Sequence, residues 1–193
     1  MVELCANKIT LYLIENKTIE ADDYELYQYA FETIVATIMQ LSIIIIIGSS
    51  FGRLIETIIF LSFYCPIRQF AGGFHTENYR RCLLFFVVVY TANIFIIDKM
   101  ISNELTTTMV VIAFVCYVGI SFLVPQEHRN VPLNTKEKKK YKKIVICICS
   151  ILMALSALGI NHTITYEYAM FGASVIVWIF IMLILGNIKE GII

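Results

Sequence analysis

Six apolar runs, separated by short polar segments, dominate the pattern of this 193-residue chain. The runs cover residues 31–50, 54–65, 82–97, 107–124, 144–160 and 166–185. A helix that crosses a bilayer needs about 17–25 residues, at a rise of about 1.5 Å per residue. The second and third runs are short by this measure, so either they are thin or kinked, or one of them only dips into the bilayer. We therefore expect an all-α integral membrane protein with about six transmembrane helices.

The composition excludes a soluble protein. Hydrophobic residues make up 59% of the chain and charged residues 16%, whereas soluble domains have about 45–50% and about 25%. So few charges cannot form a water-soluble shell around so much apolar surface. We expect a single membrane domain over residues 1–193, with an N-terminal interfacial segment at 1–30, a reactive loop at 66–81 and a basic loop at 125–143.

The charges are balanced in number but not in position. With 15 basic and 15 acidic residues the net charge is zero, which gives no support for nucleic-acid binding. Residues 1–32 have a net charge of −5 and residues 125–143 a net charge of +5. Six spans with the N-terminus inside would place 13 of the 15 basic residues on the inner side and only Arg53 and Lys99 on the outer side. The positive-inside rule therefore predicts that both termini are cytoplasmic; if the second run were only a dip, the basic loop would face outward.

The reactive loop gathers more chemically active side chains than any other part of the chain. It holds a Gly-Gly pair, a histidine, a glutamate and three arginines, and Cys82 follows it directly. A thiol becomes a nucleophile as the thiolate, and an imidazole can accept its proton. On a continuous helix His75 and Cys82 would share a face but be separated by a rise of about 10.5 Å. If the two act together, the helix must break between them, and Gly72-Gly73 supplies backbone freedom just before His75. We therefore expect a loop or re-entrant turn that ends near Arg80, with Cys82 on the first turn of the third span.

Other interpretations of the same residues stay open at this point. A cysteine at the start of a span is often only a small apolar residue, a loop histidine is often solvated, and Arg80-Arg81 resembles a topology anchor. The chain could then be a non-enzymatic small transporter or sensor, which would be expected to have buried polar residues along a path. A metal-dependent protease is disfavoured because no H-E-x-x-H motif is present. No metal site or cofactor is therefore expected.

One family resemblance separates these interpretations. The pattern Arg68-x4-Gly73-x-His75-x6-Cys82 follows an acidic N-terminal segment, and Pro125-x6-Pro132 precedes a lysine cluster. This layout resembles the AgrB family of quorum-sensing membrane cysteine endopeptidases over most of the chain, and the Gly-Gly-x-His-x6-Cys core is its specific part. The resemblance implies that Cys82 is the nucleophile and His75 its base, and that Arg68 and Gly73 match further important positions.

The resemblance also implies a substrate and a location. The substrate would be an AgrD-like propeptide, which loses its C-terminal tail through a thioester on Cys82 and is cyclised to a thiolactone or lactone signalling peptide. The protein would lie among the lipids of the bacterial cell membrane as a multi-pass protein, with its active site on the cytoplasmic side, and a homodimer is compatible with the family. Gly72, Glu77 and Arg80 flank the core as candidate supporting or substrate-binding residues. The group that orients His75 stays open among Glu77, Asn78, backbone carbonyls and Glu56.

Overall fold

The computed structural model describes residues 2–73, 79–126 and 134–191, with only the backbone at residues 79, 80 and 190. This described part is helical and contains no strand. Its elements are α1 (Val2–Glu15), a 3-10 turn η1 (Ala21–Asp23), α2 (Tyr24–Ser50), α3 (Leu54–Ala71), α4 (Tyr79–Ser102), α5 (Thr106–Leu123), α6 (Thr135–Gly159) and α7 (Tyr166–Glu190). The segments 21–50, 54–71, 81–102, 106–123, 135–159 and 166–189 are long and apolar enough to cross a membrane. The expectation of an all-α membrane protein with six spans is confirmed.

The two short apolar runs both belong to full-length helices. α3 continues past Pro66 and ends only at Ala71, which gives 18 residues and a length of about 27 Å. α4 contains 24 residues. A bilayer core is about 30 Å thick. Both helices are therefore long enough to cross it, and their length does not require either of them to be only a dip into the bilayer. The second apolar run is shorter than α3 because polar residues such as Arg68 and Gln69 occupy the last turns of this helix.

The chain divides into two compact units, residues 1–46 and 47–193. In the first unit, Val2, Ala6 and Thr10 form a buried stripe along one face of α1. The Tyr24 hydroxyl at the start of α2 donates a hydrogen bond to the Asn7 side chain, with an O–O distance of 3.0 Å. The apolar side chains of α2 are mostly exposed, as is expected of a helix that faces lipid. The expectations of an interfacial position for α1 and of a single membrane domain stay predictions.

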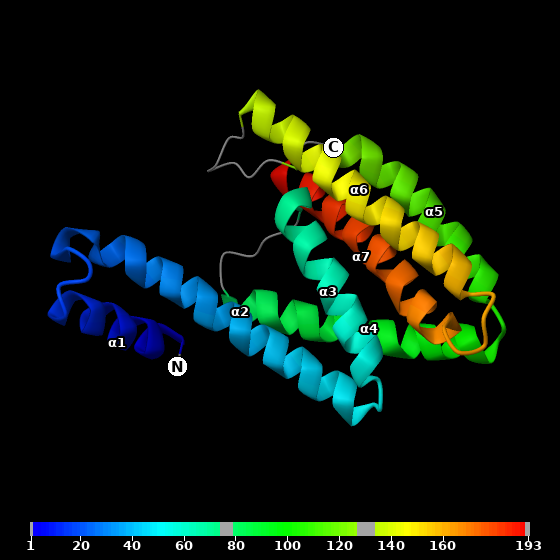
Figure 1. Ribbon diagram of the computed structural model, residues 1–193, viewed down its shortest axis with the longest axis horizontal. Helices are drawn as coiled ribbons and strands as arrows, with labels where there is room; N and C mark the ends of the chain where they lie inside the picture. Colours follow the sequence, from blue (N-terminus) through cyan, green and yellow to red (C-terminus); the bar gives the residue numbers. More distant parts are fainter. Residues whose placement is uncertain (1, 74–78, 127–133, 192–193) are drawn as a thin grey trace. The chain divides into compact units, whose positions relative to one another are not determined.

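α7 is the central helix of the second unit. It packs against α3, α5 and α6, and to a smaller extent against α4 (Figure 1). Two thirds of its most apolar stretch is buried, far more than in any other span. Small residues permit this close packing: a side chain at Gly172 would touch Ser156 of α6, and one at Gly119 of α5 would overlap the Phe180 ring. Small residues at helix contacts are typical of membrane proteins, in which close van der Waals packing drives association.

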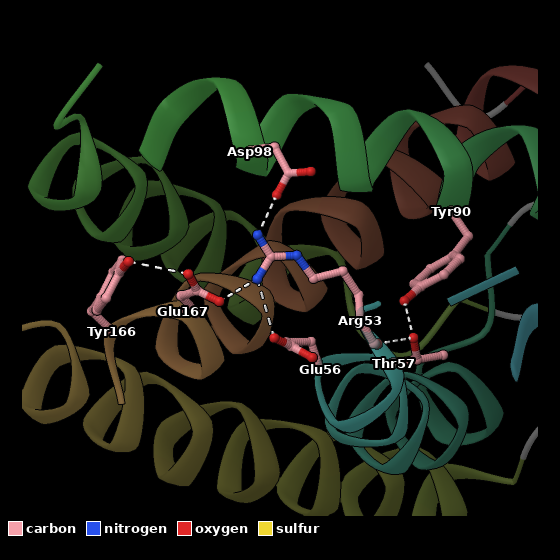
Figure 2. Close-up of polar contacts among 7 residues, drawn as sticks. All are labelled: Arg53, Glu56, Thr57, Tyr90, Asp98, Tyr166 and Glu167. Atoms are coloured by element: carbon pink, nitrogen blue, oxygen red, sulfur yellow. Dashed lines mark hydrogen bonds and ion pairs between the residues drawn. The ribbon is translucent and has the colours of Figure 1, made fainter. Parts of the chain in front are cut away.

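Three acidic residues surround a single arginine at one end of this unit (Figure 2). Arg53, in the turn before α3, forms ion pairs with Glu56 of α3 at 3.2 Å, with Asp98 of α4 at 2.8 Å, and with Glu167 of α7. Burial by itself would lower the pKa of the Arg53 guanidinium, but the three carboxylates outweigh it and hold this pKa above its ordinary value. We call Arg53, Glu56, Asp98 and Glu167 the Arg53 cluster.

The Arg53 cluster shows which helix ends lie together. It joins the start of α3, the last turns of α4 and the start of α7. At the opposite end, the chain just after α5 is bonded to the end of α3 and to the last turns of α7. Within the second unit α3 and α7 therefore run in one direction and α4 in the opposite one, and Arg53 and Lys99 belong to the same end, as the charge count required.

Replacement of Arg53 should destabilise the fold. Arg53→Gln leaves three carboxylates converging with no positive partner, so we expect a loss of about 1–3 kcal/mol in the free energy of unfolding, since the site is partly exposed. The measurement is thermal unfolding of the protein in detergent. Lys99→Gln is the matched control, because it removes one exposed positive charge from the next residue after Asp98. Equal effects of the two substitutions would contradict a specific role for the Arg53 cluster.

Candidate active site

The helix breaks where the reactive chemistry requires it. α3 ends at Ala71, and Gly72 and Gly73 follow with φ angles of +77° and +109°, which L side chains rarely adopt. α4 begins at Tyr79, so Cys82 lies on its first turn. The predicted end of the loop near Arg80 and the predicted position of Cys82 on the first turn of α4 are thus confirmed. His75, Glu77 and Asn78 lie outside the described residues, as does the side chain of Arg80, and the pairing of His75 with Cys82 stays a prediction.

Gly72 and Gly73 are held in place by a side chain of the helix they terminate. Arg68 Nη1 donates a hydrogen bond to the Gly72 carbonyl oxygen, and the Gly72 N–H donates to the Arg68 carbonyl oxygen at 3.3 Å. A side chain at Gly73 would collide with the Arg68 guanidinium and would also lie 3.1 Å from the Met182 carbonyl oxygen of α7. Glycine is therefore required here by contact as well as by backbone angle.

Residues far away in sequence close this end of the bundle. The Gln126 N–H donates a hydrogen bond to the Ala71 carbonyl oxygen at 2.9 Å, and the Gln126 side chain donates to the Asn187 side chain of α7. A side chain at Gly72 would overlap the Gln126 carbonyl oxygen. The sequence analysis missed Gln126 and Asn187; the only signal for Asn187 was a polar side chain in an apolar span, and nothing in the pattern linked it to Gln126.

Cys82 lies near the end of α3 that carries Arg68. Its side chain is half-buried and unpaired by any disulfide. Cys82 is close enough to Arg68 and to Tyr64 for electrostatic interaction with both. One turn further along α4, the Phe86 ring stacks on the Tyr64 ring with centroids 5.0 Å apart. The guanidinium and the thiol, which come from two different helices, therefore lie within electrostatic range of each other.

Glu56 does not belong to this site. Its carboxylate pairs with Arg53 in the first turn of α3, and the sixteen residues from Glu56 to Gly72 correspond to about 24 Å along the helix. The suggestion that Glu56 orients His75 is thus wrong. Among the described residues there is no group of three or more His, Cys, Asp or Glu side chains that could hold a metal ion.

The lysine-rich start of α6 lies beside the same end of α3. The Tyr141 ring contacts the Phe70 ring, with centroids 5.4 Å apart. The helix begins with a capping box, in which the Asn134 N–H donates to the Glu137 carboxylate at 2.9 Å. The exposed lysines of these turns are Lys136, Lys139, Lys140 and Lys143. A strongly basic surface therefore adjoins the Gly72-Gly73 turn through the Phe70–Tyr141 contact.

These features define a multi-pass helical membrane protein with a cysteine beside a glycine-bounded helix break. Residues 6–185 match the family model of accessory gene regulator B, and the chain belongs to this AgrB family. Family membership supports a role in quorum sensing.

Two curated relatives, both from Clostridium perfringens, are similar to this chain. AgrB-like protein 2 of strain 13 is 28% identical over 142 residues, which cover 70% of this chain and 66% of the relative, just under two thirds. An AgrB-like protein of strain SM101 is 25% identical over 166 residues, which cover 83% of this chain and 78% of the relative. No solved structure matches the chain.

The contacts at Gly73 can be tested by substitution. Gly73→Ala combines an unfavourable φ with collisions against Arg68 and α7, whereas Gly52→Ala combines a similar φ of +70° with open space. We expect Gly73→Ala to lower the free energy of unfolding by about 1–3 kcal/mol more than Gly52→Ala does. Thermal unfolding in the same detergent measures both, and an equal or larger loss for Gly52→Ala would contradict the close contact.

Proposed function

We propose that this protein is a membrane cysteine endopeptidase that removes the C-terminal tail of a small AgrD-like propeptide and permits its cyclisation. The observation that carries the proposal is the break after α3, which brings Cys82 on the first turn of α4 near Arg68. Membership of the AgrB family supports the same assignment. In this proposal Cys82 is the nucleophile and His75 is the general base.

The reaction would proceed in two acyl transfers. The Cys82 thiolate attacks a peptide carbonyl of the propeptide, while His75 holds the thiol proton and passes it to the leaving amine. The peptide C–N bond breaks, the tail leaves, and the remaining peptide is held as a thioester on Cys82. An internal Cys or Ser of the propeptide then attacks this acyl group and forms a thiolactone or lactone, and its proton returns to the Cys82 sulfur.

Arg68 and the glycines would support the first transfer. A guanidinium within electrostatic range of Cys82 can stabilise the negative charge that develops on the attacked carbonyl oxygen. Gly72 and Gly73 keep the turn compact, so that Arg68 stays close to the backbone of the reactive loop. Glu77 and Arg80 stay supporting or substrate-binding candidates.

The energetics of the two steps differ. Conversion of an amide into a thioester is uphill, so removal of the tail is needed to draw the first step forward. Exchange of one thioester for another is close to isoenergetic, and the ring can form only when water does not reach the acyl-enzyme first. A site at the bilayer surface, covered by packed helices, is suited to exclude water.

We place the Cys82 end of the bundle on the cytoplasmic side, because the inner segments then carry 13 of the 15 basic residues. The lysines at the start of α6 would attract an acidic propeptide tail. Anionic lipid headgroups compete for the same lysines, at about 1 kcal/mol per basic residue. A transporter or sensor is less well supported, because several buried polar groups of the spans pair with each other, as Thr57 does with Tyr90 and Trp178 with Asn93.

Loss of the Cys82 sulfur should abolish tail removal. Cys82→Ser is expected to lower cleavage of a co-expressed, tagged propeptide by at least about 1,000-fold, while Cys65→Ser of α3 serves as the matched control. A propeptide without its internal nucleophile should accumulate on the native protein as a hydroxylamine-sensitive adduct at Cys82, detected by mass spectrometry. Undiminished cleavage by Cys82→Ser would refute the proposal.

A thiol mechanism also predicts a particular inhibitor profile. Purified protein treated with a maleimide should lose propeptide cleavage, because alkylation removes the thiolate. Treatment with a metal chelator should leave the rate within about twofold of the untreated protein. The opposite pattern, sensitivity to the chelator alone, would favour a metal-dependent enzyme.

A further inference from the structure

A buried tyrosine lies one helical turn before Arg68 and packs on a residue one helical turn after Cys82. Tyr64 precedes Arg68 by one turn of α3 and is only 6% exposed. Its ring stacks on the ring of Phe86, which follows Cys82 by one turn of α4. Tyr64 therefore connects the two helices at the level of the proposed active site.

The ring of Tyr64 is held on two sides. On its own helix the Phe60 ring stacks on it at 5.2 Å with an angle of 14°, and Phe86 stacks on it from α4 at 5.0 Å. Both of these neighbours are phenylalanines, so a phenylalanine at position 64 would satisfy the same packing. The packing accounts for the ring of Tyr64 but not for its hydroxyl.

The hydroxyl has a charged partner. The Tyr64 hydroxyl lies within interaction range of the Arg68 guanidinium, which follows it by one turn of α3, and Arg68 Nη1 donates a hydrogen bond to the Gly72 carbonyl oxygen. A guanidinium is a planar group with five N–H donors in fixed directions. The bond to the Gly72 carbonyl oxygen and the interaction with the Tyr64 hydroxyl, from two different groups, restrict the orientation of this plane.

We infer that Tyr64 is a positioning residue, whose hydroxyl holds the Arg68 guanidinium in the orientation in which it meets the negative charge of the reaction at Cys82. This inference rests on the proposed function. It adds a residue that the Arg-Gly-His-Cys pattern does not contain, and it explains why a hydroxyl is buried within a stack of phenylalanine rings.

The decisive variant is Tyr64→Phe, which keeps the ring and removes the hydroxyl. We expect kcat for cleavage of a synthetic propeptide by purified protein to fall about 10- to 100-fold with KM nearly unchanged, as for the loss of one hydrogen bond to a charged group that matters in the transition state. Tyr90→Phe is the matched control: Tyr90 is buried in the same stack, but its hydroxyl pairs with Thr57 at 2.6 Å. Tyr90→Phe should keep kcat within about twofold.

A double-mutant cycle tests whether Tyr64 acts through Arg68. Arg68→Lys replaces the rigid fork with a single ammonium group, and adding Tyr64→Phe to it should lower kcat by no more than about twofold further. A native kcat for Tyr64→Phe, or two effects that multiply in full, would overturn the inference. If Tyr64→Phe does not fold, Arg68→Lys alone still decides: kcat should fall at least about tenfold with KM unchanged, and an unchanged kcat overturns the inference.

The outcomes separate this inference from the proposed function. Cleavage that persists in Cys82→Ser would remove the thiol mechanism itself. A dead Cys82→Ser variant together with a fully active Tyr64→Phe variant would keep the thiol mechanism and remove only the role of Tyr64.

Discussion

The fold is governed by the requirement that backbone polar groups within a bilayer find partners inside the protein. Helices meet this requirement by themselves, but a reactive loop does not. At the end of α3 the chain leaves the helix, and the backbone groups released there are bonded individually: the Gly72 carbonyl oxygen to Arg68, and the Ala71 carbonyl oxygen to Gln126. The described backbone at the end of α3 is thus bonded to other parts of the protein, which is the condition under which non-helical backbone is tolerated in membranes.

Different kinds of contact link α3 and α4 at different points along their length. At one end the charges of the Arg53 cluster join α3, α4 and α7. In the middle, the Tyr90, Phe60, Tyr64 and Phe86 rings fill the space between α3 and α4. At the other end Arg68 and Cys82 lie within electrostatic range of each other. The two helices are therefore linked by side chains at the charged end and in the aromatic middle.

The sequence predicted which segments form helices more accurately than it predicted the residues at which those helices end. Apolar runs located all six spans, and the rise of a helix between His75 and Cys82 predicted a loop that ends near Arg80, where α4 begins at Tyr79. The same runs ended too early in α3, because hydropathy fades at Arg68 and Gln69 although the helix continues to Ala71. The charge pattern predicted that Arg53 lies on the opposite side of the membrane from most other basic residues. It could not predict the ion-pair partners of Arg53, because Asp98 and Glu167 reach it only through the packing of α4 and α7.

The packing around Gly73 limits how this family could change over evolutionary time. One of its two close neighbours is the Arg68 side chain, which a compensating substitution could shorten. The other is the backbone carbonyl of Met182, which every amino acid possesses, so no replacement at position 182 creates room. A larger residue at position 73 would therefore require the α7 backbone at Met182 to shift by a few tenths of an ångström, which no substitution at position 182 can replace.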